Sequence, residues 1–439
     1  MIKMNQTTYT IDNAPVNGFH KRVVAFTMGG SFIDGYILGI IEVALLYIIP
    51  AMDMSASWQG LIGSSPLIGV FIGSLLFGKL SDTYGRQNIY KYNFVVLVVA
   101  SVLQFFVNTA MPLFILRLIL GIVIGAEYAI GPAIITEFVP SRLRGMTLAT
   151  LNVAWTVGYV GSVVIGYAME GMGDDCWRWM LASSAVFGVI ILIIRIGMPE
   201  SPRWLVLHGR TEEAVAVVKK FIGENVTIDN LLEKQEEQQH DLGYKHLFID
   251  GMWKKTMFCA IIWLAGVIPL FGLFTFLPSV LNTLGIEDES TGVMLVNLAQ
   301  LLGAVVAVFI IDRFSRKKLC MWCFVISGLP LFVLGLWSSA SGVLVVLMFG
   351  IYIFFGVIAG SLSGFVYPSE VFPTEIRSSG IGFCSAVSRI GSASGTFLVP
   401  VLTESAGIGA VLVGMGVFQL IAVVVTIIWG PETRNVAVE

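Results

Sequence analysis

Long apolar runs separated by short polar loops dominate the hydrophobic pattern of this chain of 439 residues. A helix needs about 20 apolar residues to cross a hydrocarbon layer about 30 Å thick. One segment, residues 199–254, is polar and rich in Lys, Glu and Gln, and is expected to form short helices on a membrane surface. The apolar runs predict twelve spanning helices, at residues 23–50, 59–80, 88–108, 111–136, 145–169, 178–198, 255–281, 291–311, 319–338, 342–367, 378–401 and 408–430.

The pattern therefore predicts an all-α membrane protein with two six-helix bundles. The expected divisions are an N-terminal segment, a first bundle, a linker, a second bundle and a tail, at residues 1–22, 23–198, 199–254, 255–430 and 431–439. The first 21 residues are polar and lack the apolar core of a secretory signal.

Composition supports a lipid environment, because hydrophobic residues make up 56% of the chain and charged residues only 13%, against about 25% charge in soluble domains. The net charge of -3 gives no basic surface for nucleic acid.

Four of the five cysteines fall in apolar runs, which favours packing over disulfides. The pair Cys320 and Cys323 has metal-binding spacing but no second pair beside it. We expect no metal and no cofactor.

The placement of basic residues predicts the orientation, because loops on the cytoplasmic side carry an excess of Lys and Arg. Loops after the second, fourth and eighth spans and the central segment are basic. The opposite loops carry mainly Asp and Glu, with Arg178 as their basic residue. We therefore expect both termini and the linker to be cytoplasmic, in a plasma membrane of bacterial inner-membrane type.

Three loop motifs occur twice, each pair about 230 residues apart, which indicates a duplicated six-helix unit. The pairs begin at Asp82 and Asp312, at Glu137 and Glu370, and at Pro199 and Pro431. Duplicated halves of this kind place the substrate site at mid-depth between them.

The same motifs resemble the major facilitator superfamily. Gly78-Lys-Leu-Ser-Asp82-Thr-Tyr-Gly85-Arg86 is similar to its signature loop between helices 2 and 3. Pro199-Glu-Ser-Pro-Arg-Trp204 resembles the marker of its sugar-porter and organic-ion branch. Asp34-Gly-Tyr36 and Gly-Ala-Glu127-Tyr128 resemble bacterial proton-coupled symporters of organic acids, such as aromatic acids and niacin, and of phosphate.

Ionisable residues at bilayer depth are costly and mark functional sites. Asp34 lies near the middle of the first span, and Arg117 and Glu127 lie in the fourth. The resemblance implies that Asp34 takes up the proton and that Arg117 is its partner; a static ion pair is the alternative. Glu127 either shares the proton or binds substrate. Arg195, near the end of the sixth span, is expected to snorkel to the surface.

Arg389, in the eleventh span, indicates the substrate class. Its planar guanidinium suits a carboxylate or phosphate, and the resemblance to organic-anion carriers implies that it neutralises the substrate. Glu42 lies nearer the outer surface and is more easily explained as structural. Aromatic and amide side chains are expected to line the rest of the cavity: Tyr36, Tyr128, Asn152, Trp155, Trp263, Phe271, Phe274 and Tyr352.

The charged loop motifs are expected to latch the cytoplasmic helix ends through ion pairs that break when the cavity opens. In the first copy, Arg86 and Arg144 are expected to pair with Asp82 and Glu137. In the second copy, Val308 and Ser315 stand where the family has glycines, which indicates a weaker or differently packed latch. The predicted latch residues are Gly78, Asp82, Arg86, Glu137, Arg144, Asp312, Arg316, Glu370 and Arg377.

The function that fits best is secondary active transport, in which a monomer imports a small organic anion with protons by alternating access. A sugar or other neutral metabolite carried by symport or uniport, and drug efflux by proton antiport, remain alternatives. The chain has no nucleotide-binding motif or nucleophile constellation, so an enzyme or a self-powered pump is not expected. A sensor or scaffold would need a larger soluble domain than this linker.

Overall fold

A computed structural model describes residues 9–228, 231, 244–249, 251–286, 288–311, 313–337, 340–373 and 376–433. Eleven helices in this part are long and apolar enough to cross a membrane. The last of them, α16 (Arg377–Trp429), contains Gly407 with φ 80° and ψ 159°, which breaks the helical path. At 1.5 Å per residue, 53 residues would extend about 80 Å. Helix α16 therefore supplies two spans, which gives the predicted twelve.

The first bundle consists of six long helices: α1 (Gly18–Ala51), α2 (Ala56–Tyr84), α3 (Arg86–Leu103), α4 (Ala110–Phe138), α5 (Ser141–Ala168) and α6 (Cys176–Arg195). The second consists of α10 (Met252–Thr275), α11 (Leu277–Thr283), α12 (Glu289–Ile310), α13 (Arg316–Leu336), α14 (Gly342–Ser361), α15 (Tyr367–Val371) and α16. The predicted spans overlap these helices closely. Two predicted spans are interrupted: the seventh breaks at Phe276, and the tenth passes through a π-helical turn at Leu362–Val366.

Residues from both ends of the first bundle's sequence form a small cap on it. The linker contributes α7 (Pro202–Leu207) and α8 (Thr211–Val217). Strand β1 (Tyr9–Thr10) pairs in parallel with β2 (Val226–Thr227). The Asn17 side chain, which caps α1, also donates to the carbonyls of Phe221 and Ile222 at 2.8 and 2.9 Å. We call the end of the molecule that carries α7, α8 and α15 the linker end.

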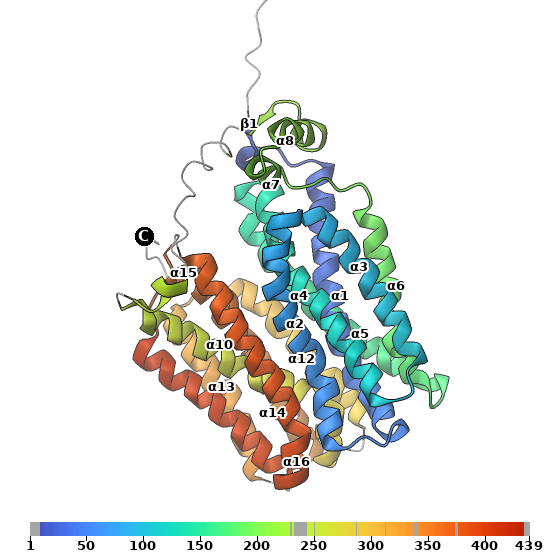
Figure 1. Cartoon of the computed structure of the whole chain (residues 1–439). Coiled ribbons are helices and arrows are strands. Elements are labelled where there is room, and N and C mark those ends of the chain that lie inside the picture. Colours follow the sequence, from blue (N-terminus) through green and yellow to red (C-terminus); the bar gives the residue numbers. More distant parts are fainter. Residues whose placement is uncertain are drawn as a thin grey trace, which may run out of the picture.

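The apolar core is shared at one end of the molecule and divided at the other. One cluster of buried side chains includes residues of both bundles, such as Tyr159 and Phe274. Towards the linker end the core separates into a cluster around Phe26 and Trp204 and another around Phe258. Figure 1 shows the same arrangement, with the bundles converging away from the linker end and diverging towards it.

Close helix crossings hold α1, the helix that carries most of the buried charge. A Cβ at Gly35 would lie 2.0 Å from the carbonyl oxygen of Trp155, and one at Gly158 would lie 1.9 Å from that of Phe32. Only glycine allows α1 and α5 to approach this closely. The backbone on both sides of Asp34 is therefore fixed against α5.

Candidate functional site

Asp34 lies in the middle of α1 and is only 1% exposed. Among the described residues, neither of its carboxylate oxygens has a hydrogen-bond partner. The charged groups whose fields act on it are Glu127, Arg195 and Arg389. A buried carboxylate without hydrogen-bond donors loses the stabilisation that water gives its charge, and no protein group replaces it. This position therefore favours uptake of a proton or approach of a cation.

Glu127 forms a closed ion pair with Arg195, which sequence reasoning missed. Nη2 of Arg195 lies 3.2 Å from Oε2 of Glu127, and the two side chains are 6% and 3% exposed. The Tyr90 hydroxyl donates to the same carboxylate. The expectation that Arg195 snorkels was wrong, because its guanidinium turns inward and stacks over the Tyr90 and Phe94 rings, 3.4 and 3.9 Å from their centroids.

Gly30 makes room for this ion pair one helical turn from Asp34. A Cβ at Gly30 would lie 2.0 Å from Oε1 of Glu127 and 3.2 Å from Nη2 of Arg195. Asp34 and Gly30 are four residues apart and so share a face of α1. The ion pair and the free carboxylate are consequently neighbours on one side of that helix.

The expected pairing of Arg117 with Asp34 does not occur in the structure. The Arg117 guanidinium is 1% exposed and donates to the carbonyl oxygen of Ile37 at 3.4 Å. Its Nε and Nη1 atoms have no hydrogen-bond partner among the described residues. Arg117 therefore faces the turn of α1 that follows Asp34, away from the linker end.

Arg389 is the cation that reaches this site from the second bundle. Its guanidinium lies 4.9 Å from the ring centroid of Tyr128, a cation–π contact between the two bundles. Its Nε atom is buried without a hydrogen-bond partner in the described part of the chain. The Arg389 side chain as a whole is partly exposed, and a guanidinium with an unpaired donor is suited to an anion.

Four of the predicted aromatic residues meet where the bundles meet. Trp155 packs edge-on against Phe271 at 6.3 Å between centroids, and Tyr159, beside Trp155, contacts Phe274 at 6.4 Å. The Trp155 Nε1 atom is buried and has no partner among the described atoms. Trp155, Phe271 and Phe274 therefore lie at the bundle interface, as Tyr128 does.

Three other predicted lining residues have their contacts within a single bundle. Tyr36 is fully buried within the first bundle, where its hydroxyl hydrogen-bonds Ser183 at 2.6 Å, so its assignment to the cavity was wrong. Tyr352 is 1% exposed and packs on Phe349 in the second bundle's core. Trp263 packs beside Gly364 within the same bundle. Asn152, on α5, is half-buried.

A hydrogen bond joins the bundles on the side away from the linker end. Nδ2 of Asn297, on α12, donates to Oε1 of Glu42 at 3.2 Å, and both residues are almost completely buried. Two amide oxygens here, of Asn297 and Gln300, lack partners among the described residues. Glu42 therefore takes part in closing this end.

At the linker end, the first copy of the loop motif is organised around Glu200. Its carboxylate accepts the backbone N–H groups of Arg86 and Gln87, both at 3.0 Å, at the start of α3. Gly85 has φ 89°, and a Cβ there would lie 2.4 Å from Glu200 Oε2. The Arg86 side chain forms an ion pair with Glu137, as one predicted latch requires.

Arg144 departs from the expected latch. It forms an ion pair with Asp12, from the N-terminal segment, and its Nε donates to the Val139 carbonyl at 2.9 Å. Arg144 therefore attaches the N-terminal cap to α5 and does not pair with Glu137.

The second copy repeats the first with one change. Glu432 accepts the backbone N–H of Arg316 at 3.0 Å, and Arg316 pairs with Glu370 at 3.2 Å. Ser315 replaces Gly85 and donates its hydroxyl to Glu432. The described part of the second latch therefore keeps the Arg–Glu ion pair and is packed differently from the first at Ser315. Asp312 lies outside the described residues, as do the side chains of Gly78, Asp82 and Arg377.

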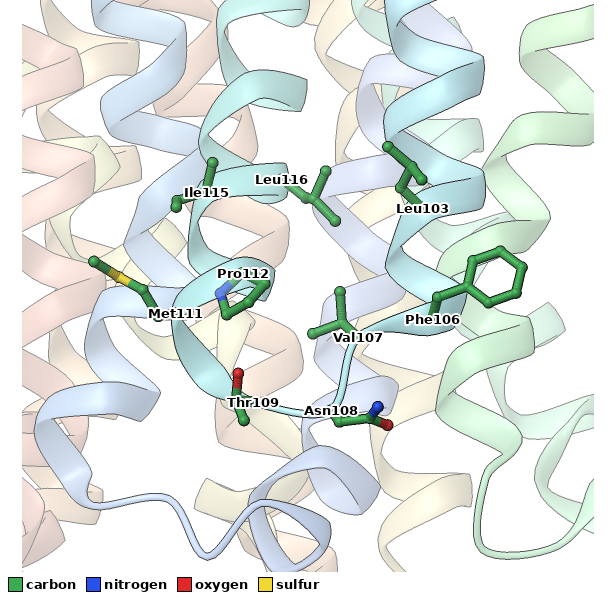
Figure 2. Close-up of a pocket in the computed structure, with 9 residues that line it drawn as sticks. All are labelled: Leu103, Phe106, Val107, Asn108, Thr109, Met111, Pro112, Ile115 and Leu116. Atoms are coloured by element: carbon green, nitrogen blue, oxygen red, sulfur yellow. The ribbon is translucent and has the colours of Figure 1, made fainter.

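A surface groove of about 570 Å³ opens between the ends of α3 and α4 that lie away from the linker end (Figure 2). Its lining is apolar except for Asn108 and Thr109. Phe106 and Met111 are 68% and 56% exposed. Such a surface suits lipid chains and has no charged group, so it is not the site of ion or anion binding.

Two six-helix bundles around a buried charged site define a polytopic membrane transporter. Residues 5–439 match the family described as sugar (and other) transporter. The chain belongs to this family, a sugar-porter branch of the major facilitator superfamily, and is not an enzyme. It is 36% identical to the inner membrane metabolite transport protein YgcS of Escherichia coli, over 98% of this chain and 96% of that one.

Two further likenesses concern substrate and fold. The niacin transporter NiaP of Acinetobacter baylyi is 23% identical over 98% of both chains. The partially occluded inward open structure of the xylose transporter XylE from E. coli matches with a TM-score of 0.83 and 20% identity, over 96% of this chain and 100% of that one.

Proposed function

We propose that this transporter imports a small organic anion, a carboxylate, together with protons by alternating access. The observation that carries the proposal is a pair of opposite charges, Asp34 on the first bundle and Arg389 on the second: both carboxylate oxygens and the Arg389 Nε lack a hydrogen-bond partner among the described residues. Asp34 is placed to take up the proton. Arg389 is placed to bind the anion, with Tyr128 beneath its guanidinium.

The direction of transport rests on the orientation of the bundles. The linker end carries the basic loops and is the cytoplasmic end by the positive-inside rule. The shared apolar core and the Glu42–Asn297 bond lie at the other end. This arrangement is the inward-facing state, and the reverse rocking of the bundles would open the site to the outside.

A carboxylate on a flat ring fits the surroundings of Arg389. The guanidinium offers a planar fork of donors, and Tyr128, Trp155 and Phe271 offer aromatic surface at the bundle interface. The printed name of one relative, a niacin transporter, supports an aromatic acid as substrate. Proton coupling is supported by the isolation of the Asp34 carboxylate.

A second candidate is symport of a neutral polyhydroxyl compound. The amide oxygens of Asn297 and Gln300 are buried without hydrogen-bond partners among the described residues, and amides are suited to sugar hydroxyls. The likeness to a xylose transporter supports this candidate at the level of the fold.

Thermal stabilisation of the purified protein in detergent distinguishes these candidates. A ligand that binds the folded state stabilises it by RT ln(1 + [L]/Kd), about 2.7 kcal/mol at a concentration of 100 Kd. We would compare nicotinate with nicotinamide, benzoate with benzamide, and both pairs with lactate, phosphate, glucose and xylose. The expected result is a rise in Tm with a carboxylate and none with its neutral amide.

Arg389→Gln is expected to weaken carboxylate binding by 10-fold or more, since a hydrogen bond to a charged group contributes about 1.5–3 kcal/mol. Arg210→Gln is the matched control, because Arg210 lies on α8 and pairs there with Glu213. Equal stabilisation by acid and amide, or an unchanged carboxylate affinity in Arg389→Gln, would contradict the anion site. Stabilisation by a sugar alone would favour the second candidate.

A further inference from the structure

The outer surface of the second bundle changes from apolar to basic at the linker end of α13. Trp322, Leu329 and Leu336 are largely exposed and recur every seven residues, so they form one apolar stripe along this helix. Lys318 lies one turn before Trp322, on the same face, and is also exposed. The stripe that faces the hydrocarbon of the membrane therefore ends at an ammonium group.

Two contacts bring the starts of α10 and α13 to the same helix end. Nζ of Lys317, in the first turn of α13, donates to the Ile427 carbonyl near the end of α16 at 3.0 Å. Two residues further along α16, the Trp429 ring packs edge-on against the Trp253 ring, with 5.7 Å between centroids. Both helix starts therefore lie against the last turn of α16.

The first turn of α10 adds two more lysines. Lys254 and Lys255 follow Trp253, and all three side chains are exposed. Nζ of Lys254 lies 5.9 Å from the centroid of the Trp253 ring. Tryptophan is enriched where hydrocarbon meets headgroups, because its ring is apolar and its N–H is polar. An exposed tryptophan at this place therefore puts the neighbouring lysines at the level of lipid headgroups.

The acidic residues nearby are occupied by other groups. Glu432, just beyond the end of α16, accepts hydrogen bonds from the Ser315 hydroxyl and the Arg316 backbone N–H. Glu370 pairs with the Arg316 guanidinium. Four ammonium groups thus have no ion-pair partner among the described residues: Lys254, Lys255, Lys317 and Lys318.

The corresponding end of the first bundle is covered. Arg22, at the start of α1, donates to the Ile194 and Ile196 carbonyls at the end of α6, and α7 and α8 lie over this end of the bundle (Figure 1). At the second bundle, the described linker adds the short turn Tyr244–Leu247 and leaves Trp253 exposed. The basic surface there is therefore accessible from the membrane.

We infer that an anionic phospholipid binds at this end of the second bundle. Its acyl chain follows the stripe of Trp322 and Leu329 along α13. Clusters of four or more basic residues next to a spanning helix attract acidic lipids, by about fivefold in affinity for each lysine. A zwitterionic lipid would fit the stripe equally well and leave the ammonium groups uncompensated. The headgroup phosphate lies among four side chains, which we call the lysine rim: Lys254, Lys255, Lys317 and Lys318.

The test measures how phosphatidylglycerol stabilises the purified protein in mixed detergent micelles. Tm is recorded at rising mole fractions of this lipid, and of phosphatidylcholine with the same acyl chains. The expected result is a saturable rise in Tm with phosphatidylglycerol and a much smaller rise with phosphatidylcholine. Because the attraction is electrostatic, the midpoint should move to a higher mole fraction when salt is raised from about 0.1 M to about 1 M.

Two double variants locate the site. Lys254→Gln with Lys255→Gln should weaken the response to phosphatidylglycerol about 25-fold, since each lysine contributes about fivefold. Lys219→Gln with Lys220→Gln is the matched control, because these exposed neighbours lie on the linker beside α8; it should leave the response unchanged. Neither pair of lysines has an ion-pair partner among the described residues, so both variants should keep the wild-type Tm without added lipid.

Equal stabilisation by the two lipids, or an unchanged response in Lys254→Gln with Lys255→Gln, would overturn the inference. An equal loss in the control variant would also overturn it, since the attraction would then not be specific to the lysine rim. Inorganic phosphate and glycerol phosphate are tested alone, and stabilisation by either would assign the rim to a soluble anion instead. Self-association in size-exclusion chromatography that the Lys254→Gln, Lys255→Gln variant loses would assign it to a second copy of the chain.

Discussion

The two bundles are alike at the linker end and unlike at mid-depth. At the linker end each has a glutamate that accepts the first backbone N–H of a helix, with an Arg–Glu ion pair beside it. At mid-depth, five charged side chains of the described residues are buried in the first bundle, and Arg389 of the second bundle is partly buried. The two halves therefore share the contacts that hold their helix ends together and differ in the charged residues at mid-depth.

This difference assigns separate tasks to the halves. In the proposed function, the first bundle carries the groups that hold or exchange a proton, on helices fixed by close crossings. The second bundle contributes Arg389, whose guanidinium contacts Tyr128 of the first. A movement of the bundles would change the distance between Arg389 and Asp34 more than any distance within the first bundle.

The largest effect on stability is expected from breaking the buried pair of the first bundle. Glu127→Leu leaves Arg195 buried without its counter-charge, which costs about 3–5 kcal/mol. The double variant with Arg195→Met removes both charges and should recover most of that loss. Thermal unfolding in detergent measures the loss of stability in the single variant and its recovery in the double variant. If the single variant is as stable as the wild type, the pair does not hold the first bundle's charges in balance.

A smaller effect should distinguish the two loop motifs. Gly85→Ala places a side chain at φ 89° and against Glu200, and a backbone conformation reserved for glycine costs about 1–3 kcal/mol. Ser315→Ala, at the corresponding position, keeps an ordinary backbone with φ -57° and loses a helix cap, for about 1 kcal/mol. Equal losses of Tm would show that the two motifs do not differ in this way.

The smallest effect is expected at the hydrogen bond between the bundles. Asn297→Ala removes the donor of a hydrogen bond of 3.2 Å to Glu42, and a typical hydrogen bond contributes about 0.5–1.5 kcal/mol to stability. The variant should lower Tm slightly and make a cysteine placed at Trp155 more accessible to a thiol reagent added from outside. Unchanged labelling would mean that this bond does not keep that end closed.

The sequence predicted the fold well because lipid leaves few alternatives to long apolar helices. Its errors have local causes. The break at Gly407 falls between two predicted spans, but the seventh span was predicted as one helix, and the structure breaks it at Phe276, with α11 beginning at Leu277. Arg195 was predicted to extend to the membrane surface because it lies near a helix end. Its ion-pair partner, Glu127, lies on another helix, and their contact depends on how the helices pack.

Contacts between distant segments were the hardest part of the site to predict. The roles of Glu200 and Glu432 were visible only as repeated Pro-Glu dipeptides, and their contacts with the starts of α3 and α13 depend on the folded chain. Arg117 was matched to Asp34 by resemblance, and the structure places it against the carbonyl of Ile37. Which partner a buried charge meets depends on helix rotation, which a single sequence does not contain.

Proton-driven uptake through Asp34 is the central claim, and transport in proteoliposomes tests it most directly. Vesicles containing the wild type or Asp34→Asn are loaded at pH 7.5 or so and diluted into a more acidic buffer with labelled nicotinate, with an ionophore-treated sample to collapse the gradient. We predict accumulation above the external concentration by the wild type and only equilibration by Asp34→Asn. Equal accumulation by both proteins, after correction for passive entry of the neutral acid into empty vesicles, would contradict the account.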